Sequence, residues 1–538
     1  STTAAPASAS AGKASGTAVP AASAAPQGWQ ELDAHVMGHH LGFQVSPLVR
    51  RDEKTTVLAL KLTRAKDDPA VKDIADASGD SSSNTFEASM PLSRPGRLRR
   101  SDWGANGVRL LDLPTNRAWV ATASVENKVK DNYNDLSLKP GESTSCFVLF
   151  GPVDAKEVTV FVPQAGFVTV NVLDSSAAAA SGIDFKAIDK AFDSVANPNY
   201  EAKPDQALAA PVPIERYTKA LDDSTSTHTG SKDITVTLAS DVTFASDSAD
   251  LASGAEAQLQ TVAGQLGQYP DGGTLSIVGH TDDVQDDAYN QTLSEKRANA
   301  VKTRLEQLTK LNKWQTSVSG KGESQPKIND TTDQARAANR RVEITLTPTS
   351  GTTKKGSSPT PDSSDASTLP ASEGPSAKGS DGVTVTAKSA NSNGEVTIVL
   401  DHVTRQGGYL VGTLTCTVKP SSHSANLTVL LTDLENRSGN QRDEDTGSTA
   451  TFMATDGLTL ISGTERVFPA DYEQADIKAH IPLTELYVGD ELLGGTVTAV
   501  GVVWPDPGGD TVTLDHPQSE DSYSTTAFRL TDIPVKNS

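Results

Sequence analysis

The feature that most constrains the fold of this chain is an arginine in the apolar stripe of a predicted helix. Residues 291–311 repeat apolar side chains at helical spacing. On a helical wheel Arg297 shares its face with four of them: Leu293, Val301, Leu305 and Leu308. A guanidinium at a core position needs an acidic partner, because burying it alone carries a large desolvation cost. The helix must therefore lie against a segment that supplies a carboxylate.

The nearest acidic candidate is Asp282. It follows the apolar, strand-like run 275–278 and is expected at the end of that strand, close to the start of the helix. An acid and a base held side by side can form a structural salt bridge. They can also hold a ligand that carries both an ammonium and a carboxylate. Spacing alone leaves both interpretations open.

Periodicity and chain breakers predict the elements around this junction. Strands are expected over residues 234–244, 275–278, 316–319 and 341–346, and helices over residues 251–266 and 291–311. The resulting β-α-β-α-β-β order predicts a two-layer α/β sandwich. Asp282 and Arg297 would both lie at the edge where a strand is followed by a helix, a usual place for a site in such sheets.

The same residues resemble the OmpA-like peptidoglycan-binding domain. The resemblance spans residues 232–348, about a fifth of the chain. Its motifs are T-D, N-x-x-L-S-x-x-R-A-x-x-V, a Gly- and Pro-marked loop, and N-R-R-V-E-I. The matching positions are Thr281, Asp282, Asn290, Leu293, Ser294, Arg297, Ala298, Val301, Gly320, Gly322, Pro326, Asn329, Asn339, Arg340, Arg341, Val342, Glu343 and Ile344. The resemblance implies that Asp282 and Arg297 hold the diaminopimelate of the peptidoglycan stem peptide.

Five further residues complete the candidate binding site. Thr281 belongs to the T-D motif, and Asp247 stands where the family often has an asparagine. Asn290 either adds amide hydrogen bonds to the ligand or caps the helix N-terminus. Arg340 and Arg341 open the last strand, where alternation sends one side chain to each face. We expect one of them to line the groove and the other to be solvated.

The loop after Asp282 departs from the family pattern. Gln285 stands where the family normally carries a glycine, so the loop conformation is expected to differ. The extra acids Asp283, Asp286 and Asp287 favour an ammonium and permit a calcium site, although the alternating acids of a calcium loop are missing. His280 is expected to support this loop.

A second cluster of candidate metal ligands lies near the N-terminus, at His35, His39 and His40. It lacks a clear further ligand. We therefore predict no metal site and no cofactor.

Composition shifts divide the whole chain into six segments. They are a disordered tether (1–27), a β-sandwich (28–176), a linker with a short helix (177–231), the OmpA-like domain (232–348), a disordered linker (349–381) and a second β-sandwich (382–538). The two outer segments resemble each other, because residues 150–163 align without a gap on residues 504–517. A duplicated domain explains this alignment.

Short alternating runs in the outer segments favour antiparallel, immunoglobulin-like β-sandwiches. Examples are residues 57–62, 147–150, 427–431 and 497–503. The predicted fold is therefore a multidomain α+β chain with a central two-layer α/β sandwich and two flanking sandwiches. Such flanking domains are typical of spacers and of modules that contact other envelope proteins.

Composition narrows the functional class. The net charge of -21 argues against binding to nucleic acid or to anionic polymers over a broad surface. The two cysteines, Cys146 and Cys416, lie in separate segments and are expected to be buried free thiols. No apolar run approaches the length of a membrane helix. The start at Ser1 suggests that a signal segment was removed or excluded, and a lipidated Cys before Ser1 would make the protein an envelope lipoprotein.

Two hypotheses follow. The first is a non-catalytic, extracytoplasmic protein of the bacterial cell envelope that binds peptidoglycan while its β-sandwiches contact other partners. The second is a wall-associated enzyme, or the regulatory subunit of one, with an unrecognised site in a β domain. The chain contains no G-x-S-x-G, H-E-x-x-H or phosphate-loop motif, so we predict no catalytic residues.

Overall fold

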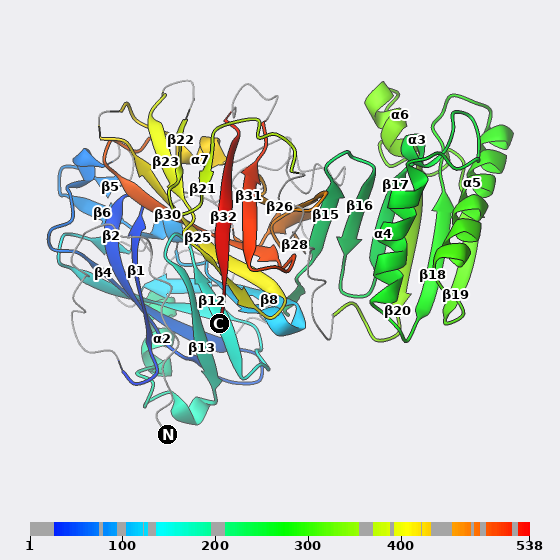
Figure 1. The fold of residues 1–538 in the computed structure, drawn as a ribbon. Coiled ribbons are helices and arrows are strands. Elements are labelled where there is room, and N and C mark those ends of the chain that lie inside the picture. Colours follow the sequence, from blue (N-terminus) through cyan, green and yellow to red (C-terminus); the bar gives the residue numbers. More distant parts are fainter. Residues whose placement is uncertain are drawn as a thin grey trace. The chain divides into compact units, whose positions relative to one another are not determined.

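The chain folds into two compact units in a computed structural model (Figure 1). The structure describes residues 26–74, 79–93, 104–121, 123–126, 136–194, 210–353, 369–387, 392–420, 422–431, 455–474, 478–484, 491–518 and 526–538. Unit 1 contains residues up to Ile214, Pro370–Leu460 and Pro469–Ser538. Unit 2 contains Glu215–Leu369 and Ile461–Phe468.

Unit 2 is built on one twisted sheet with helices on one face (Figure 1). Its central strands are β17 (Ile234–Ala239), β20 (Arg341–Pro348), β18 (Gly273–Gly279) and β19 (Trp314–Gly320), in that spatial order. Only β18 and β19 are parallel to each other. The helices are α3 (Ser240–Thr243), α4 (Ala255–Gly267), α5 (Asp287–Leu308) and α6 (Asp333–Asn339). The predicted β-α-β-α-β-β order is present, and the short helices α3 and α6 were not predicted.

The alternation of the strands sets the core of unit 2. Ile277 of β18 pairs with Ile344 of β20, and both are fully buried on the face that carries the helices. Leu259 of α4 and Val301 of α5 pack against this face. A shift of one residue in either strand would turn these side chains to the opposite face, so the hydrophobic pattern fixes the register.

Helix α5 lies unusually close to the sheet. The Asp286 side chain accepts a 2.9 Å hydrogen bond from the Tyr289 N–H and so caps the helix. A Cβ added to Gly279 would lie 2.1 Å from the Ser294 carbonyl oxygen, and one added to Gly320 would lie 2.3 Å from Ser294 Oγ. Both glycines are required by this approach, which holds Arg297 one turn further along at a fixed height above the sheet.

The sheet of unit 2 extends beyond the predicted domain. The hairpin β15 (Arg216–Ala220) and β16 (Thr225–Thr229) pairs with β17 through β16, although residues 177–231 were expected to be a linker. Strand β27 (Glu465–Val467), from much later in the sequence, pairs with β15. Inside this segment Phe468 packs on Tyr217 with ring centroids 5.3 Å apart.

Unit 1 repeats one strand-pairing pattern twice. In the first half β1–β2–β4 are consecutive neighbours, β4 also pairs with β11, and β3 joins β13 in parallel. In the second half β22–β23–β25 are neighbours, β25 pairs with β30, and β24 joins β32 in parallel. The strands of the first half are β1 (Gln30–Val36), β2 (His39–Val45), β3 (Leu48–Arg50), β4 (Thr56–Arg64), β11 (Ser143–Phe150), β12 (Glu157–Val162) and β13 (Gly166–Leu173). Those of the second half are β22 (Val383–Thr386), β23 (Glu395–Val399), β24 (Val403–Gln406), β25 (Tyr409–Val418), β30 (Val497–Pro505), β31 (Thr511–His516) and β32 (Phe528–Asn537).

This repetition agrees with the sequence alignment of residues 150–163 on 504–517, which places β12 on β31. The parallel pairs mean that the halves are not purely antiparallel, and their immunoglobulin-like description stays a prediction. Residues 427–431, expected as part of a strand, form the short helix α7 (Leu427–Leu431).

The two halves of unit 1 share a core, although two separate domains were expected. Leu111 and Phe161 of the first half belong to one buried cluster with Val411 and Val503 of the second. The Tyr409 hydroxyl donates a 2.6 Å hydrogen bond to Asn116 Oδ1 across this contact. Alternation in the sequence shows that one face of a strand is buried, but it does not show which segment covers that face.

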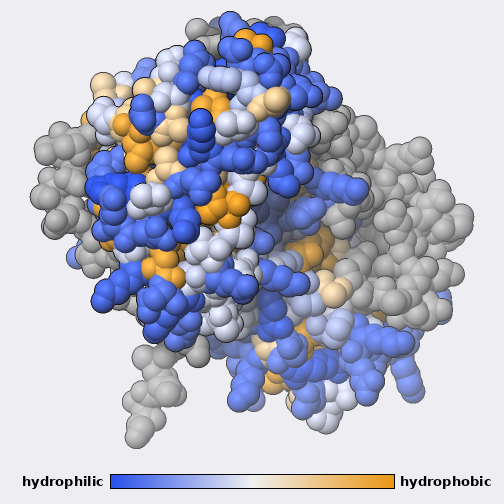
Figure 2. Space-filling view, turned by 90° about the vertical axis from the view of Figure 1, so that its right-hand side faces the viewer, coloured by the Kyte–Doolittle hydropathy of each residue, from blue (hydrophilic) through white to orange (hydrophobic). Residues whose placement is uncertain are grey.

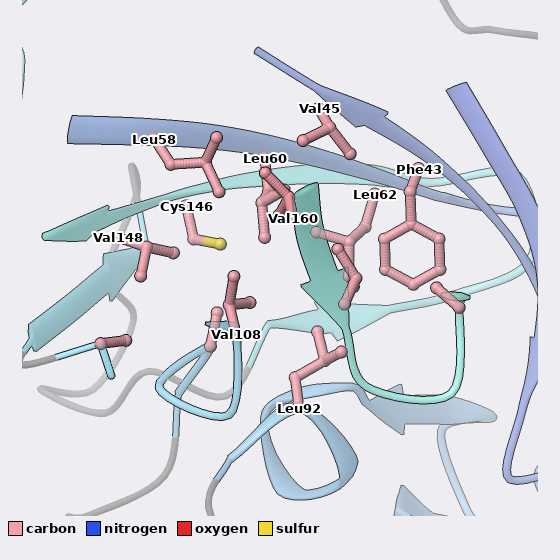
Figure 3. Close-up of a cluster of buried hydrophobic side chains, with 14 of the residues drawn as sticks. Phe43, Val45, Leu58, Leu60, Leu62, Leu92, Val108, Cys146, Val148 and Val160 are labelled. Carbon is pink, nitrogen blue, oxygen red and sulfur yellow. The ribbon is translucent and has the colours of Figure 1, made fainter. Parts of the chain in front are cut away.

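The first half also has its own core. Figure 3 shows side chains of β2, β4 and β11, including Phe43, Leu60 and Val148, pointing toward one another, with Leu92 and Val108 on the opposite side. Cys146 lies in this cluster, and both it and Cys416 are buried as predicted, with no disulfide formed by either among the described residues. The predicted short helix in residues 177–231 is α2 (Phe185–Ser194), which packs on β3, β4 and β11.

Parts of two predicted segments lie outside the described residues. They are residues 1–25 of the tether at 1–27 and residues 354–368 of the linker at 349–381. The rest of that linker, which was expected to be disordered, contains strand β21 (Ser376–Lys378), and this strand pairs with β32 in parallel. Within the described residues, no helix is both long enough and apolar enough to cross a membrane.

Candidate functional site

The site is assembled where two strands of unit 2, β17 and β18, end and a third, β20, begins. Asp241 lies in α3 directly after β17, Asp282 lies in the loop between β18 and α5, and Arg340 lies between α6 and β20. Arg297 reaches the same place from the third turn of α5. These residues are far apart in sequence, and the order of strands in the sheet brings them together.

Arg297 is buried on the face of α5 that packs on unit 2, as its position in the apolar stripe predicted. Its Nε donates a 2.9 Å hydrogen bond to the Ser248 carbonyl oxygen, and its guanidinium lies 5.0 Å from the centre of the Phe244 ring. Desolvation lowers the pKa of Arg297, and Asp241 and Asp247 are the strongest of the opposing charges. Within the described part of the chain, Nη1 and Nη2 have no hydrogen-bond partner. The outer edge of this guanidinium is therefore available to a ligand.

Asp282 binds a different arginine from the one expected. Its Oδ2 accepts a 2.7 Å hydrogen bond from Arg340 Nη1, and its Oδ1 accepts one of 3.3 Å from the Val284 N–H. No ion pair joins Asp282 to Arg297 among the described residues. The structural salt bridge considered between these two residues is therefore wrong. Asp282 contributes to the field at Arg297 without contacting it.

Arg340 ties two acids into one network. Its Nε and Nη2 each donate a 2.8 Å hydrogen bond to a carboxylate oxygen of Asp241, while Nη1 reaches Asp282. These hydrogen bonds, led by those to Asp241, raise the pKa of Arg340 further above its already high value. The planar guanidinium can serve both acids at once, which a lysine could not. Asp241 was not predicted as a site residue, although an acid at the end of β17 was the available signal.

Arg341 is not solvated, in contrast to the expectation for this pair of arginines. Its buried guanidinium donates to Glu343 Oε1 at 2.7 Å, to the Asn339 carbonyl at 3.3 Å and to the Gln325 carbonyl at 3.2 Å. Arg341 therefore supports the loop before β20, and among the described residues it forms no ion pair with Asp282 or Asp241. Arg340 is the arginine at the site.

Asn290 holds the loop that carries Asp282. Its buried Nδ2 donates to the carbonyls of Asp282 and Gln285, at 3.1 and 3.0 Å, and to Glu323 Oε2 at 2.6 Å. The capping role considered for Asn290 is wrong, because Asp286 caps α5. Since the amide nitrogen is engaged by the protein, Asn290 acts by positioning the backbone around Asp282. Gln285, the departure from the family pattern, is held by this same amide.

Two neighbouring side chains are buried without hydrogen-bond partners. The Thr281 N–H binds the Gly322 carbonyl at 3.0 Å, but its Oγ1 has no partner among the described residues. Both ring nitrogens of His280 are likewise unbonded, and the closest carboxylate oxygen, on Glu343, is 3.8 Å away. Burial first, and then the charge of Arg341, lower the pKa of His280 to about 4. His280 is therefore neutral at pH 7 and does not form an ion pair with Glu343.

Asp247 has a left-handed backbone, with φ of 48°. Aspartate and asparagine tolerate this conformation better than most residues. Its carbonyl accepts a 3.4 Å hydrogen bond from the Tyr289 hydroxyl. Its carboxylate adds negative charge facing Arg297.

Two of the three extra loop acids have individual partners. Asp283 forms a 2.8 Å ion pair with Arg336, and Asp286 caps α5. Among the described residues these acids do not group closely enough to hold a metal ion, so the calcium alternative has no structural support.

The three N-terminal histidines also have separate partners. His39 binds Asp68 in the interior at 2.7 Å, whereas His35 and His40 stack on each other. Asp68 also accepts a 2.6 Å hydrogen bond from Arg64, and the His39 and Asp68 side chains are fully buried. This cluster is part of the core of unit 1.

Comparison with known proteins concerns unit 2 alone. The OmpA family matches residues 243–340. Outer membrane porin F of Pseudomonas aeruginosa is 41% identical over 103 residues, which are 19% of this chain and 29% of the relative. The probable lipoprotein YiaD of Escherichia coli is 34% identical over 116 residues, which are 21% of this chain and 52% of the relative. The chain thus spans about a third to a half of the length of these relatives.

Solved structures match a similar share of the chain. The cell wall anchor of the T6SS from Pseudomonas aeruginosa is 26% identical, with 24% of this chain and 90% of that chain covered and a TM-score of 0.21. The peptidoglycan-associated lipoprotein from Burkholderia pseudomallei is 27% identical, with 21% and 87% covered and a TM-score of 0.17.

Proposed function

We infer from the OmpA family domain at residues 243–340 that this protein associates with peptidoglycan in the bacterial cell envelope. The outer-membrane and lipoprotein names of its sequence relatives support this location. We propose further that the ligand is the diaminopimelate of the stem peptide, and that the association is non-covalent and involves no reaction. Lipid attachment and envelope partners for unit 1 stay predictions.

The observation that carries the proposal is the free edge of the Arg297 guanidinium beside three carboxylates. The ligand's amino-acid head presents an ammonium and a carboxylate on one carbon. Arg297 Nη1 and Nη2 can donate two parallel hydrogen bonds to the carboxylate. Asp282 can accept from the ammonium through Oδ1, because Arg340 occupies Oδ2. Because no protein carboxylate contacts this buried guanidinium, pairing with such a ligand strongly lowers the free energy of the complex.

The rest of the network fixes the geometry before binding. Arg340 orients the carboxylate of Asp282, and Asn290 holds its backbone carbonyl. Preorganisation of this kind increases affinity because little conformational freedom is lost when the ligand binds. Asp247 and Asp241 repel a ligand that carries only a carboxylate, so the site favours a zwitterion over a simple anion.

Co-sedimentation of the full chain with diaminopimelate-type peptidoglycan tests this proposal. Arg297→Gln and Asp282→Asn should leave most of the protein in the supernatant. Arg304→Gln and Asp283→Asn are matched controls on the same helix and loop, and they should pellet like the wild type. All variants should first be shown to have a folded unit 2 at the temperature of the assay. A wild type that does not pellet, or controls that lose binding equally, would contradict the proposal.

A further inference from the structure

The exposed large hydrophobic side chains of the described residues all border this one site. They are Leu251, Val284 and Tyr289, which are 37%, 60% and 41% exposed. Single exposed apolar residues are common on protein surfaces, but their restriction to one place in a long chain is informative. In Figure 2 the surface of the visible side is mainly hydrophilic, with small separate hydrophobic patches.

Each of these three residues is hydrogen-bonded to, or paired through its backbone with, a residue at the site. The Val284 N–H binds Asp282 Oδ1 at 3.3 Å. The Tyr289 hydroxyl binds the Asp247 carbonyl at 3.4 Å. The Leu251 backbone pairs with Phe244, whose ring lies against Arg297. We call these three side chains the apolar rim.

The core of unit 2 does not account for the apolar rim. The three residues lie outside the buried cluster of this unit, and Val284 is the most exposed of them. A threonine at 284 or a glutamine at 251 could make the same backbone hydrogen bonds with less apolar exposure. The apolar character of these positions is therefore available to a ligand.

We propose that the apolar rim binds the methyl group of the alanine that follows diaminopimelate in the stem peptide. This inference rests on the proposed function and extends it from one residue of the ligand to its neighbour. Three methylene groups separate the clamped amino-acid head of diaminopimelate from the peptide backbone, so the next residue passes over the side chains that surround the clamp. The rim makes the site selective for diaminopimelate within a peptide that carries this alanine.

Titration of the full chain with two synthetic tetrapeptides tests the rim. One ligand is alanyl-γ-glutamyl-diaminopimelyl-alanine, and the other has glycine as its last residue. The wild type should bind the alanine peptide about fourfold more tightly, the factor that about 0.8 kcal/mol for one buried methyl group gives. The variant Val284→Thr with Leu251→Gln should bind both peptides, with this preference reduced to less than twofold. Tyr289→Phe keeps the ring and should keep the preference.

The outcomes separate the rim from the clamp. If the wild type binds both peptides equally, or the rim variant keeps the fourfold preference, the rim proposal is wrong and the clamp proposal stands. If Arg297→Gln binds as tightly as the wild type, or the wild type binds neither peptide, the proposed function itself fails.

Discussion

Replacing Arg340 by alanine should destabilise unit 2 by about 2 kcal/mol, mostly through Asp282. The Asp282 side chain is 14% exposed, so its 2.7 Å charge-assisted hydrogen bond contributes about 1.5 kcal/mol. The Asp241 side chain is 53% exposed, so the paired hydrogen bonds to it are screened by solvent and add about 0.5 kcal/mol. Arg340 itself is 28% exposed, which allows water to replace part of the loss.

The assay must resolve unit 2 from unit 1. Only one of the five tryptophans, Trp314, belongs to unit 2, so total fluorescence would mix the two transitions. Hydrogen exchange of the β20 amides reports the opening free energy of this sheet directly. Arg336→Ala is a matched control, because Arg336 pairs with one exposed carboxylate, Asp283, and should cost less than about 0.5 kcal/mol. If the β20 amides are equally protected from exchange in the Arg340→Ala and Arg336→Ala variants, Arg340 does not hold Asp282 as described.

Three further predictions follow from unit 2. Asn290→Ala leaves the Asp282 and Gln285 carbonyls without their donor and should lower the free energy of unfolding of unit 2 by about 2 kcal/mol, measured by hydrogen exchange of the β20 amides. Gly279→Ala forces a Cβ against the Ser294 carbonyl and should cost about 3 kcal/mol by the same measurement, whereas Gly264→Ala, with open space around it, should not destabilise. His280 has a folded pKa of about 4, so the unfolded state binds more protons between pH 4 and its ordinary value of 6.5. Stability should therefore fall as the pH drops through this window, by up to about 1.4 kcal/mol per unit, and His280→Asn should remove this part of the slope.

The central fold was predictable because its signals are local. The alternation in β17, β18 and β20 and the helical spacing in α5 each identify a buried face without reference to other segments. The positions of Asp282 and Arg297 at a strand-to-helix edge follow from the same patterns. The OmpA family match at residues 243–340 confirmed the domain resemblance.

The pairing of charges within the site was not predictable in the same way. Asp241 and Arg340 are 99 residues apart, and they meet only because β17 and β20 are neighbours in the sheet. The sequence places an acid and several arginines near one edge but does not show which partners they choose. Arg341 was misjudged because strand alternation predicts a direction, while Glu343 and two carbonyls determine its burial.

Hairpin β15–β16 and strand β27 were missed for a related reason. Their sequences are short and rich in threonine, serine and charged residues, so neither has an apolar run that would mark a strand. Backbone pairing with a preformed edge at β17 supplies what their side chains lack.

The shared core of unit 1 has a consequence for the order of folding. Gln164 Oε1 accepts a hydrogen bond from Thr498 Oγ1, 334 residues later in the chain. Contacts of such separation form slowly, because a long loop must close before they become favourable. During synthesis, Leu111 and Phe161 therefore stay uncovered until strands near Val503 are available. Strands β15 to β20 of unit 2 all precede Pro370 and only β27 comes from the late segment, so most of this sheet can form first. A chain that stops before Pro370 would carry an open apolar face in unit 1, and such a face is prone to aggregation.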